Sequence, residues 1–170
     1  MLKRISVTGP ESTGKSWLAE QLASHYQTRW VREYAREYLE ENGPDYGSED
    51  VVKIAKGQLE REEKAALKGR NLLFCDTDVL VTKIWSEVVF GACPTWIEQQ
   101  FETHSYDLYL LCYPDIPWEP DPLRENPENR EELFQLYESA LIKQGFPFRV
   151  VKGLGSERLE NAINFVEEIL

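Results

Sequence analysis

The chain has 170 residues, of which 42% are hydrophobic and 29% charged, proportions that exclude disordered and membrane-embedded classes and fit one domain spanning 1–170. Nineteen basic and thirty acidic residues give a formal net charge of -11, which disfavours a nucleic-acid partner because no basic patch offsets it. No apolar run approaches the ~20 residues that span a bilayer, and the first segment lacks the apolar region of a signal peptide, so we expect a cytoplasmic protein without a membrane partner.

Apolar runs of strand length alternate with helical repeats along the chain. The run LKRISVT predicts a buried strand, and Leu18, Leu22 and Tyr26 then recur at helical spacing. The terminal helix begins at Ser156 and turns Leu159, Ile163, Val166 and Leu170 inward. In chain order, strands are predicted at 2–8, 28–31, 71–76, 106–112 and 148–152, and helices at 15–26, 33–42, 48–68, 78–90, 94–103, 129–144 and from 156 onward.

Strands that are continuous apolar runs separated by helices indicate a parallel sheet with both faces covered. We therefore predict an α/β, three-layer fold with a five-stranded sheet. Residues 113–130 hold five of the nine prolines and cannot form a regular element. Loops of this length inside a compact domain often act as lids, so we expect a lid-like loop here.

The stretch GPESTGKS matches the phosphate-binding pattern G-x-x-x-x-G-K-[ST], and it lies between a predicted strand and a predicted helix, as a P-loop should. Its backbone N–H groups and the following helix N-terminus favour a phosphate, Lys15 would reach the β and γ phosphates, and Ser16 would bind Mg²⁺. A glycine turn used only for shape is the alternative. Predicted nucleotide contacts are Gly9, Glu11, Ser12, Thr13, Gly14, Lys15, Ser16, Trp17, Arg124 and Arg130, with ATP and Mg²⁺ as cofactors.

Two aspartates follow the strongest buried strand, in LLFCDTD. Asp76 should lie at the carboxyl edge of the sheet, where α/β proteins bind ligands, and is predicted to hold the metal together with Ser16. Asp78 either faces the same site or caps the next helix.

The segment REYARE follows the second strand and is a natural floor for a second substrate. Glu33 and Arg36 lie three residues apart, so they are neighbours on a helix. Glu33 is predicted to accept a hydroxyl proton, with Asp76 as the second choice, and Arg36 to hold a phosphoryl oxygen or Glu33. A solvated surface ion pair is the alternative.

The proline-rich loop carries Trp118, Asp121, Arg124 and Arg130. Phosphoryl transfer needs positive charge around the transferred group, and Arg124 is the preferred source because loop closure would bring it in. Solvated side chains are the alternative for both arginines.

Several other residues are candidates for substrate contact. Aromatic rings that could stack on a base are those of Tyr34, Trp85, Trp96 and Trp118, although most tryptophans lie in the core. Gly57 interrupts a helix at a cost of ~1 kcal/mol relative to alanine, which indicates that another group packs closely there. The neighbouring Gln58 could reach the site. The predicted substrate contacts are Glu33, Tyr34, Arg36, Gln58, Asp78, Trp85, Trp118 and Asp121.

Taken together, GPESTGKS, REYARE, IAKGQ, FCDTD and PWEPDPLR resemble, in this order, the nicotinamide riboside kinase domain of the NadR proteins, over Ile5 to about Gly153. The resemblance implies phosphorylation of the riboside 5′-hydroxyl by ATP and Mg²⁺, giving nicotinamide mononucleotide for NAD salvage. It assigns Lys15 and Ser16 to ATP and Mg²⁺, Asp76 to the metal region, Glu33 and Asp78 to the riboside and Arg124 to the transferred group. We expect a stand-alone form, because Met1 directly precedes the first strand.

We therefore predict a P-loop NTPase fold of the nucleoside/nucleotide kinase type, with the five strands in the order 2-3-1-4-5. The predicted catalytic residues are Lys15, Glu33, Asp76 and Arg124, and the expected partner is a small-molecule nucleoside. A pyridinium cation suits the acidic chain and stacks on tryptophan with a gain of ~0.5–2 kcal/mol. Two alternatives remain: a regulatory ATPase or switch that acts through protein contacts, and a kinase for another nucleoside. The sequence leaves the acceptor, the base, any separate adenylyltransferase and the oligomeric state open.

Overall fold

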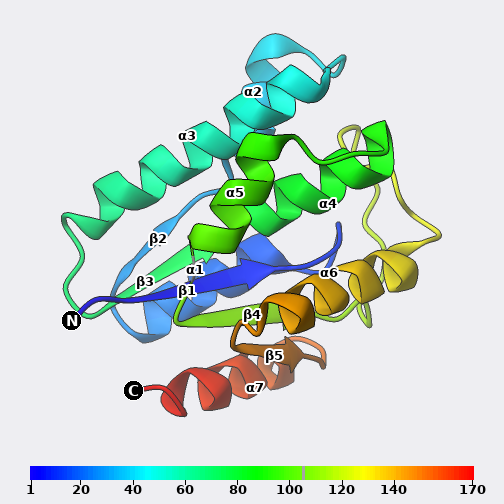
Figure 1. The fold of residues 1–170 in the computed structure, drawn as a ribbon. Helices are drawn as coiled ribbons and strands as arrows, with labels where there is room; N and C mark the ends of the chain where they lie inside the picture. The colour runs from blue at the N-terminus through cyan, green and yellow to red at the C-terminus, as the bar shows by residue number, and fades with distance from the viewer. Residues whose placement is uncertain (105) are drawn as a thin grey trace.

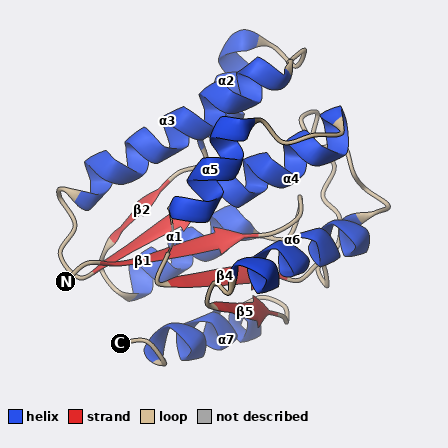
Figure 2. Cartoon of the chain, in the orientation of Figure 1, coloured by secondary structure: helices blue, strands red, loops and turns tan. Residues whose placement is uncertain are grey.

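The computed structural model describes residues 1–104 and 106–170 and shows a parallel sheet between two layers of helices (Figure 1, Figure 2). The sheet has five strands in the order β2-β3-β1-β4-β5, which confirms the predicted α/β class and strand order. Its strands are β1 (Lys3–Thr8), β2 (Arg29–Val31), β3 (Leu72–Asp76), β4 (Leu108–Cys112) and β5 (Phe148–Val151). The helices are α1 (Lys15–His25), α2 (Tyr34–Asn42), α3 (Ser48–Ala66), α4 (Val79–Phe90), α5 (Thr95–Thr103), α6 (Arg130–Gln144) and α7 (Ser156–Glu167).

Alternate residues of the central strands supply two separate cores. Leu72 and Phe74 of β3 pack with α1 and α7, whereas Leu73 and Cys75 pack with the layer that contains α3, α4, α5 and α6. This alternation follows from the period of two along a strand, and both sets are apolar because helices cover both faces. The register pairs Ile5 of β1 with Phe74 and with Leu108 of β4, so the carboxyl ends of the three strands form one edge.

The ends of the elements differ little from the sequence-based prediction. Helix α7 ends at Glu167, so Leu170 lies beyond it and is 60% exposed, whereas it was predicted to face inward. The buried residues of α7 are Arg158, Ala162 and Val166, so a charged side chain lies on the inward stripe of this helix. Residues 113–129 contain no helix or strand, as the prolines predicted. Within the described residues, no helix combines the length and the apolarity needed to cross a membrane.

Candidate functional site

The P-loop joins the end of β1 to the start of α1 through two left-handed glycines. Gly9 has φ 134° and Gly14 has φ 75°, conformations that a residue with a Cβ rarely adopts. A Cβ on Gly9 would lie 2.9 Å from the Cys112 carbonyl oxygen, so β4 also requires glycine there. Lys15 Nζ donates to the Pro10 carbonyl at 2.8 Å, and Thr13 Oγ1 donates to the same oxygen at 2.8 Å. The loop is therefore an ordered cradle and not a surface turn.

Asp76 closes β3 directly beside this cradle. It is 1% exposed, and its Oδ2 accepts a hydrogen bond from Ser16 Oγ at 2.5 Å. Burial raises the pKa of Asp76 to about 7, with a further contribution from the negative charge of Glu33.

The donor set around Asp76 fits a magnesium ion. Asp76 Oδ1 is buried and has no hydrogen-bond partner among the described residues. A buried carboxylate oxygen without a partner is costly, and Mg²⁺ prefers carboxylate and hydroxyl oxygens. Asp76 and Ser16, the two residues predicted to hold the metal, together provide both kinds of oxygen.

Asp78 combines the two roles that the sequence left open. Its Oδ1 accepts from the Val81 N–H at 3.0 Å, so it caps α4. The carboxylate also accepts from Ser6 Oγ at 2.6 Å and Thr8 Oγ1 at 3.1 Å, and burial raises its pKa to about 6. Asp78 nevertheless lines the main cavity, where it can also face a ligand.

A single cavity of about 690 Å³ runs from the P-loop to an aromatic end. At that end Trp85 Nε1 donates to Tyr46 Oη at 2.8 Å, and the two rings meet edge to face. A smaller cavity of about 340 Å³ adjoins Ser16, Glu33 and Asp76. Of the predicted residues, the main cavity is lined by Gly9, Glu11, Ser12, Thr13, Gly14, Lys15, Ser16, Trp17, Glu33, Arg36, Gln58, Asp78, Trp85 and Arg124.

Gln58 and Tyr34 fix the start of α2 from the side of α3. Gln58 is 2% exposed; its Oε1 accepts from the Tyr34 N–H at 2.9 Å, and its Nε2 donates to the Asp76 carbonyl at 3.3 Å. The Tyr34 ring lies on Gly57, where an added Cβ would come within 2.1 Å of it, and Arg61 lies 4.6 Å above the ring. The structure thus places Tyr34 against α3 and outside the cavity lining, because the absence of a side chain at Gly57 makes room for the ring.

The loop 113–130 lies against the P-loop. The Glu11 carboxylate accepts from the backbone N–H groups of Glu125 and Asn126, at 3.2 Å and 3.0 Å, and Ser12 Oγ accepts from the Glu119 N–H at 2.8 Å. Arg124 lines the cavity while its guanidinium donates to the Glu119 carbonyl.

Three predicted ligand contacts on this loop face elsewhere. Arg130 donates to the Ser12 and Ile116 carbonyls at 2.8 Å and 2.9 Å, so its donors are turned to the backbone and not to the cavity. Trp118 lies beside it, with its ring 5.7 Å from the guanidinium. Asp121 pairs with Arg36 at 3.1 Å and so joins the loop to α2.

Sequence reasoning missed three residues of this site: Arg158, Tyr46 and Glu125. Arg158 is 1% exposed and lines the cavity at α7. Tyr46 Oη donates to the Glu125 carboxylate at 2.9 Å and so extends the aromatic end to the loop. The available signal for Arg158 was its spacing of four and eight residues from Ala162 and Val166, which places a charge on an inward stripe.

Comparison with known proteins gives consistent results. The model of the AAA_28 family, described as an AAA domain, matches residues 4–158. The chain is 26% identical to the trifunctional NAD biosynthesis/regulator protein NadR of Escherichia coli (strain K12), covering 99% of this chain and 43% of that protein. It therefore spans less than half the length of this curated relative.

Solved structures show the same relationship. Crystal structures of a NadR protein in complex with NR and in complex with NAD and AMP-PNP superpose with TM-scores of 0.79 and 0.77, at 26% and 25% identity, over 98% of this chain and 49% of theirs. Deoxyadenosine kinase from M. mycoides shares the fold, with a TM-score of 0.70 at 16% identity over 98% of this chain and 100% of its own.

Proposed function

The chain belongs to the AAA_28 family of AAA domains, in a form homologous to the kinase region of NadR, and from this premise we propose that it is an ATP-dependent nicotinamide riboside kinase. The observation that carries the proposal is the cavity whose lining includes both the P-loop and Trp85 at the aromatic end, together with Glu33 and Asp78. A phosphoryl donor and an acceptor fit into one such cavity with their reacting groups adjacent.

The two ends of the cavity suit the two substrates. A NadR structure holds AMP-PNP, which supports an adenine nucleotide on Lys15 and the P-loop amides. Another holds NR, and the ring of Trp85 next to Tyr46 offers a stacking surface for its pyridinium, with the Glu125 carboxylate nearby. Mg²⁺, held by Ser16 and Asp76, would neutralise charge on the phosphates.

Phosphoryl transfer then follows from the placement of charged side chains. The acceptor 5′-hydroxyl oxygen forms a bond to the γ-phosphorus while the bond from that phosphorus to the bridging oxygen breaks, and ADP leaves. The hydroxyl proton passes to the Glu33 carboxylate. Lys15 and Arg124 balance the charge on the transferred group, and the loop 113–130 excludes water that would otherwise hydrolyse ATP.

The test is a panel of ribosides incubated with ATP and Mg²⁺, with ADP and the phosphorylated product quantified separately. We expect nicotinamide riboside to give nicotinamide mononucleotide and ADP in equal amounts, and the folded variant Lys15→Ala to give neither. Slow ADP formation that is independent of any riboside would instead indicate a regulatory ATPase. A different riboside as the best acceptor would leave a nucleoside kinase but refute the substrate assignment.

A further inference from the structure

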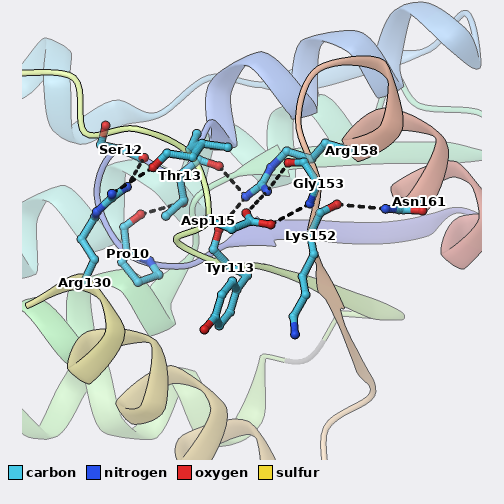
Figure 3. Close-up of polar contacts among 11 residues, drawn as sticks. Pro10, Ser12, Thr13, Tyr113, Asp115, Arg130, Lys152, Gly153, Arg158 and Asn161 are labelled. Carbon is cyan, nitrogen blue, oxygen red and sulfur yellow. Dashed lines mark hydrogen bonds and ion pairs between the residues drawn. The ribbon is translucent and has the colours of Figure 1, made fainter.

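Two arginines donate to consecutive carbonyls of the P-loop. Arg130, the first residue of α6, donates to Ser12 O at 2.8 Å, and Arg158, in the first turn of α7, donates to Thr13 O at 2.9 Å. Figure 3 shows both guanidinium groups beside the loop, approaching it from separate segments. Neither contact is assigned by the phosphate-binding pattern, which concerns the loop's own residues.

A hydrogen bond to one of these carbonyls also fixes the N–H group of the next residue. The two groups belong to one planar trans peptide and point in opposite directions. Arg130 therefore orients the Thr13 N–H, and Arg158 orients the Gly14 N–H, away from the respective guanidinium. Among the described residues, neither N–H has a protein acceptor, although Thr13 is fully buried. A buried N–H group without a partner, such as that of Thr13, indicates a missing acceptor, and a phosphate supplies one. Gly14 is half-buried and lines the cavity, so its N–H is open to a ligand there.

The backbone of the P-loop is strained, so it requires stabilising contacts from residues outside the loop. Ser12 has φ 55° although it carries a side chain, and Gly14 follows at φ 75°. A left-handed backbone is unfavourable for a residue other than glycine and persists only when the surrounding structure holds it. The two arginines act on the carbonyls of the peptides that directly follow Ser12 and directly precede Gly14.

Arg158 also connects the P-loop to the segments that follow β4 and β5. Its guanidinium donates to Asp115 Oδ1 at 2.6 Å, to the Tyr113 carbonyl at 2.8 Å and to the Gly153 carbonyl at 3.0 Å. Figure 3 shows the group at the junction of the segments after β4 and after β5. A charge that is 1% exposed is costly, and a stabilising role alone is a weak reason for it, because apolar packing often stabilises as well or better.

We propose that Arg158, with Arg130, is a positioning residue for the nucleotide: the two side chains hold the Ser12 and Thr13 carbonyls outward so that the Thr13 and Gly14 N–H groups face the phosphates. Neither arginine has to touch the nucleotide. The proposal rests on the proposed function only in that the P-loop binds ATP, and it holds for any acceptor.

The test compares binding of ATP with binding of adenosine, which has the same base and sugar but no phosphate, by calorimetry without any acceptor. Arg158→Lys and Arg130→Lys keep the charge but lose the guanidinium fork. We expect each to weaken ATP about tenfold, the worth of one hydrogen bond to a charged group, and to leave adenosine unchanged. Arg149→Lys is the control, because Arg149 is half exposed and pairs with Glu168 at 3.0 Å.

Each outcome decides the proposal. An equal loss of ATP and adenosine affinity would overturn it, because a merely structural role predicts that result. Unchanged ATP affinity would also overturn it, because lysine keeps the charge and a purely electrostatic role predicts no change. If Arg158→Lys does not fold, Asp115→Asn removes one anchor of the guanidinium and should reproduce the selective loss of ATP affinity in part. A wild-type protein that binds ATP but phosphorylates no riboside refutes the proposed function and leaves this test intact.

Discussion

Replacing Asp76 with asparagine should abolish turnover and at the same time stabilise the metal-free protein. Burial, and then the charge of Glu33, raises the pKa of Asp76 from 3.8 to about 7. A tenfold change in proton affinity is worth ~1.4 kcal/mol, so ionisation of this carboxyl in the folded protein costs ~4 kcal/mol above about pH 7. The neutral amide of Asp76→Asn avoids that cost, but it only partly reproduces a protonated carboxyl. We therefore expect a gain of ~2 kcal/mol, or ~4–8 °C in Tm for a domain of this size.

The stability difference between Asp76→Asn and the wild-type protein should depend on pH. Because the folded pKa is raised, the folded state holds this proton more tightly than the unfolded chain, and the contribution of Asp76 to stability falls as pH rises from about 4 to about 7. The advantage of Asp76→Asn should be largest at about pH 8 and narrow on acidification, because wild-type Asp76 then also becomes neutral.

The assay is chemical or thermal unfolding of both proteins in chelated buffer across this pH range, with phosphorylation followed separately in Mg²⁺. Loss of a metal ligand should lower turnover at least about a hundredfold. Asp45→Asn, in an exposed loop, is the matched control and should change neither quantity. An Asp76→Asn protein that is less stable than wild type at about pH 8, or a stability difference independent of pH, would refute the electrostatic reasoning.

Three further substitutions test separate parts of the site. Glu33→Gln removes a charge that raises the pKa of Asp76, so the pH below which Mg²⁺-dependent ADP binding is lost should decrease. Turnover should fall by about 10²–10⁴ if Glu33 is the base. An unchanged pH dependence of ADP binding would contradict this reasoning. Trp85→Leu should raise the KM for nicotinamide riboside by about 5- to 30-fold, seen in steady-state kinetics, with the KM for ATP unchanged. Gly57→Ala forces a Cβ to within 2.1 Å of the Tyr34 ring and should cost ~1–2 kcal/mol in urea unfolding, whereas Gly47→Ala, with its nearest atom at 3.9 Å, should be nearly neutral.

The sequence predicted well what depends on local pattern. The order of the elements followed from apolar runs and helical spacing, and the position of Asp76 followed from its place at the end of a buried strand. The P-loop conformation followed from its glycines, because only a few residue patterns allow that backbone.

What the sequence did not reveal are contacts between distant segments. The Arg158 contact with Thr13 and the Tyr46 contact with Trp85 join residues whose proximity depends on how whole helices pack. Likewise, Tyr34 and Trp118 are aromatic residues near the site, but packing on Gly57 and beside Arg130 turns them away from the cavity. Residue type indicates what a side chain can do, and the surrounding elements decide where it points.

The Glu11 contact with the loop 113–130 bears on how this scaffold can be redesigned. Glu11 mainly recognises main-chain N–H groups, those of Glu125 and Asn126, and it contacts one side chain there, the Asn126 amide at 3.2 Å. Amide N–H groups are supplied by every amino acid except proline. A library that varies Glu125 and keeps Asn126 should therefore alter acceptor preference while retaining a docked loop, which makes this position a practical starting point for directed evolution toward other ribosides.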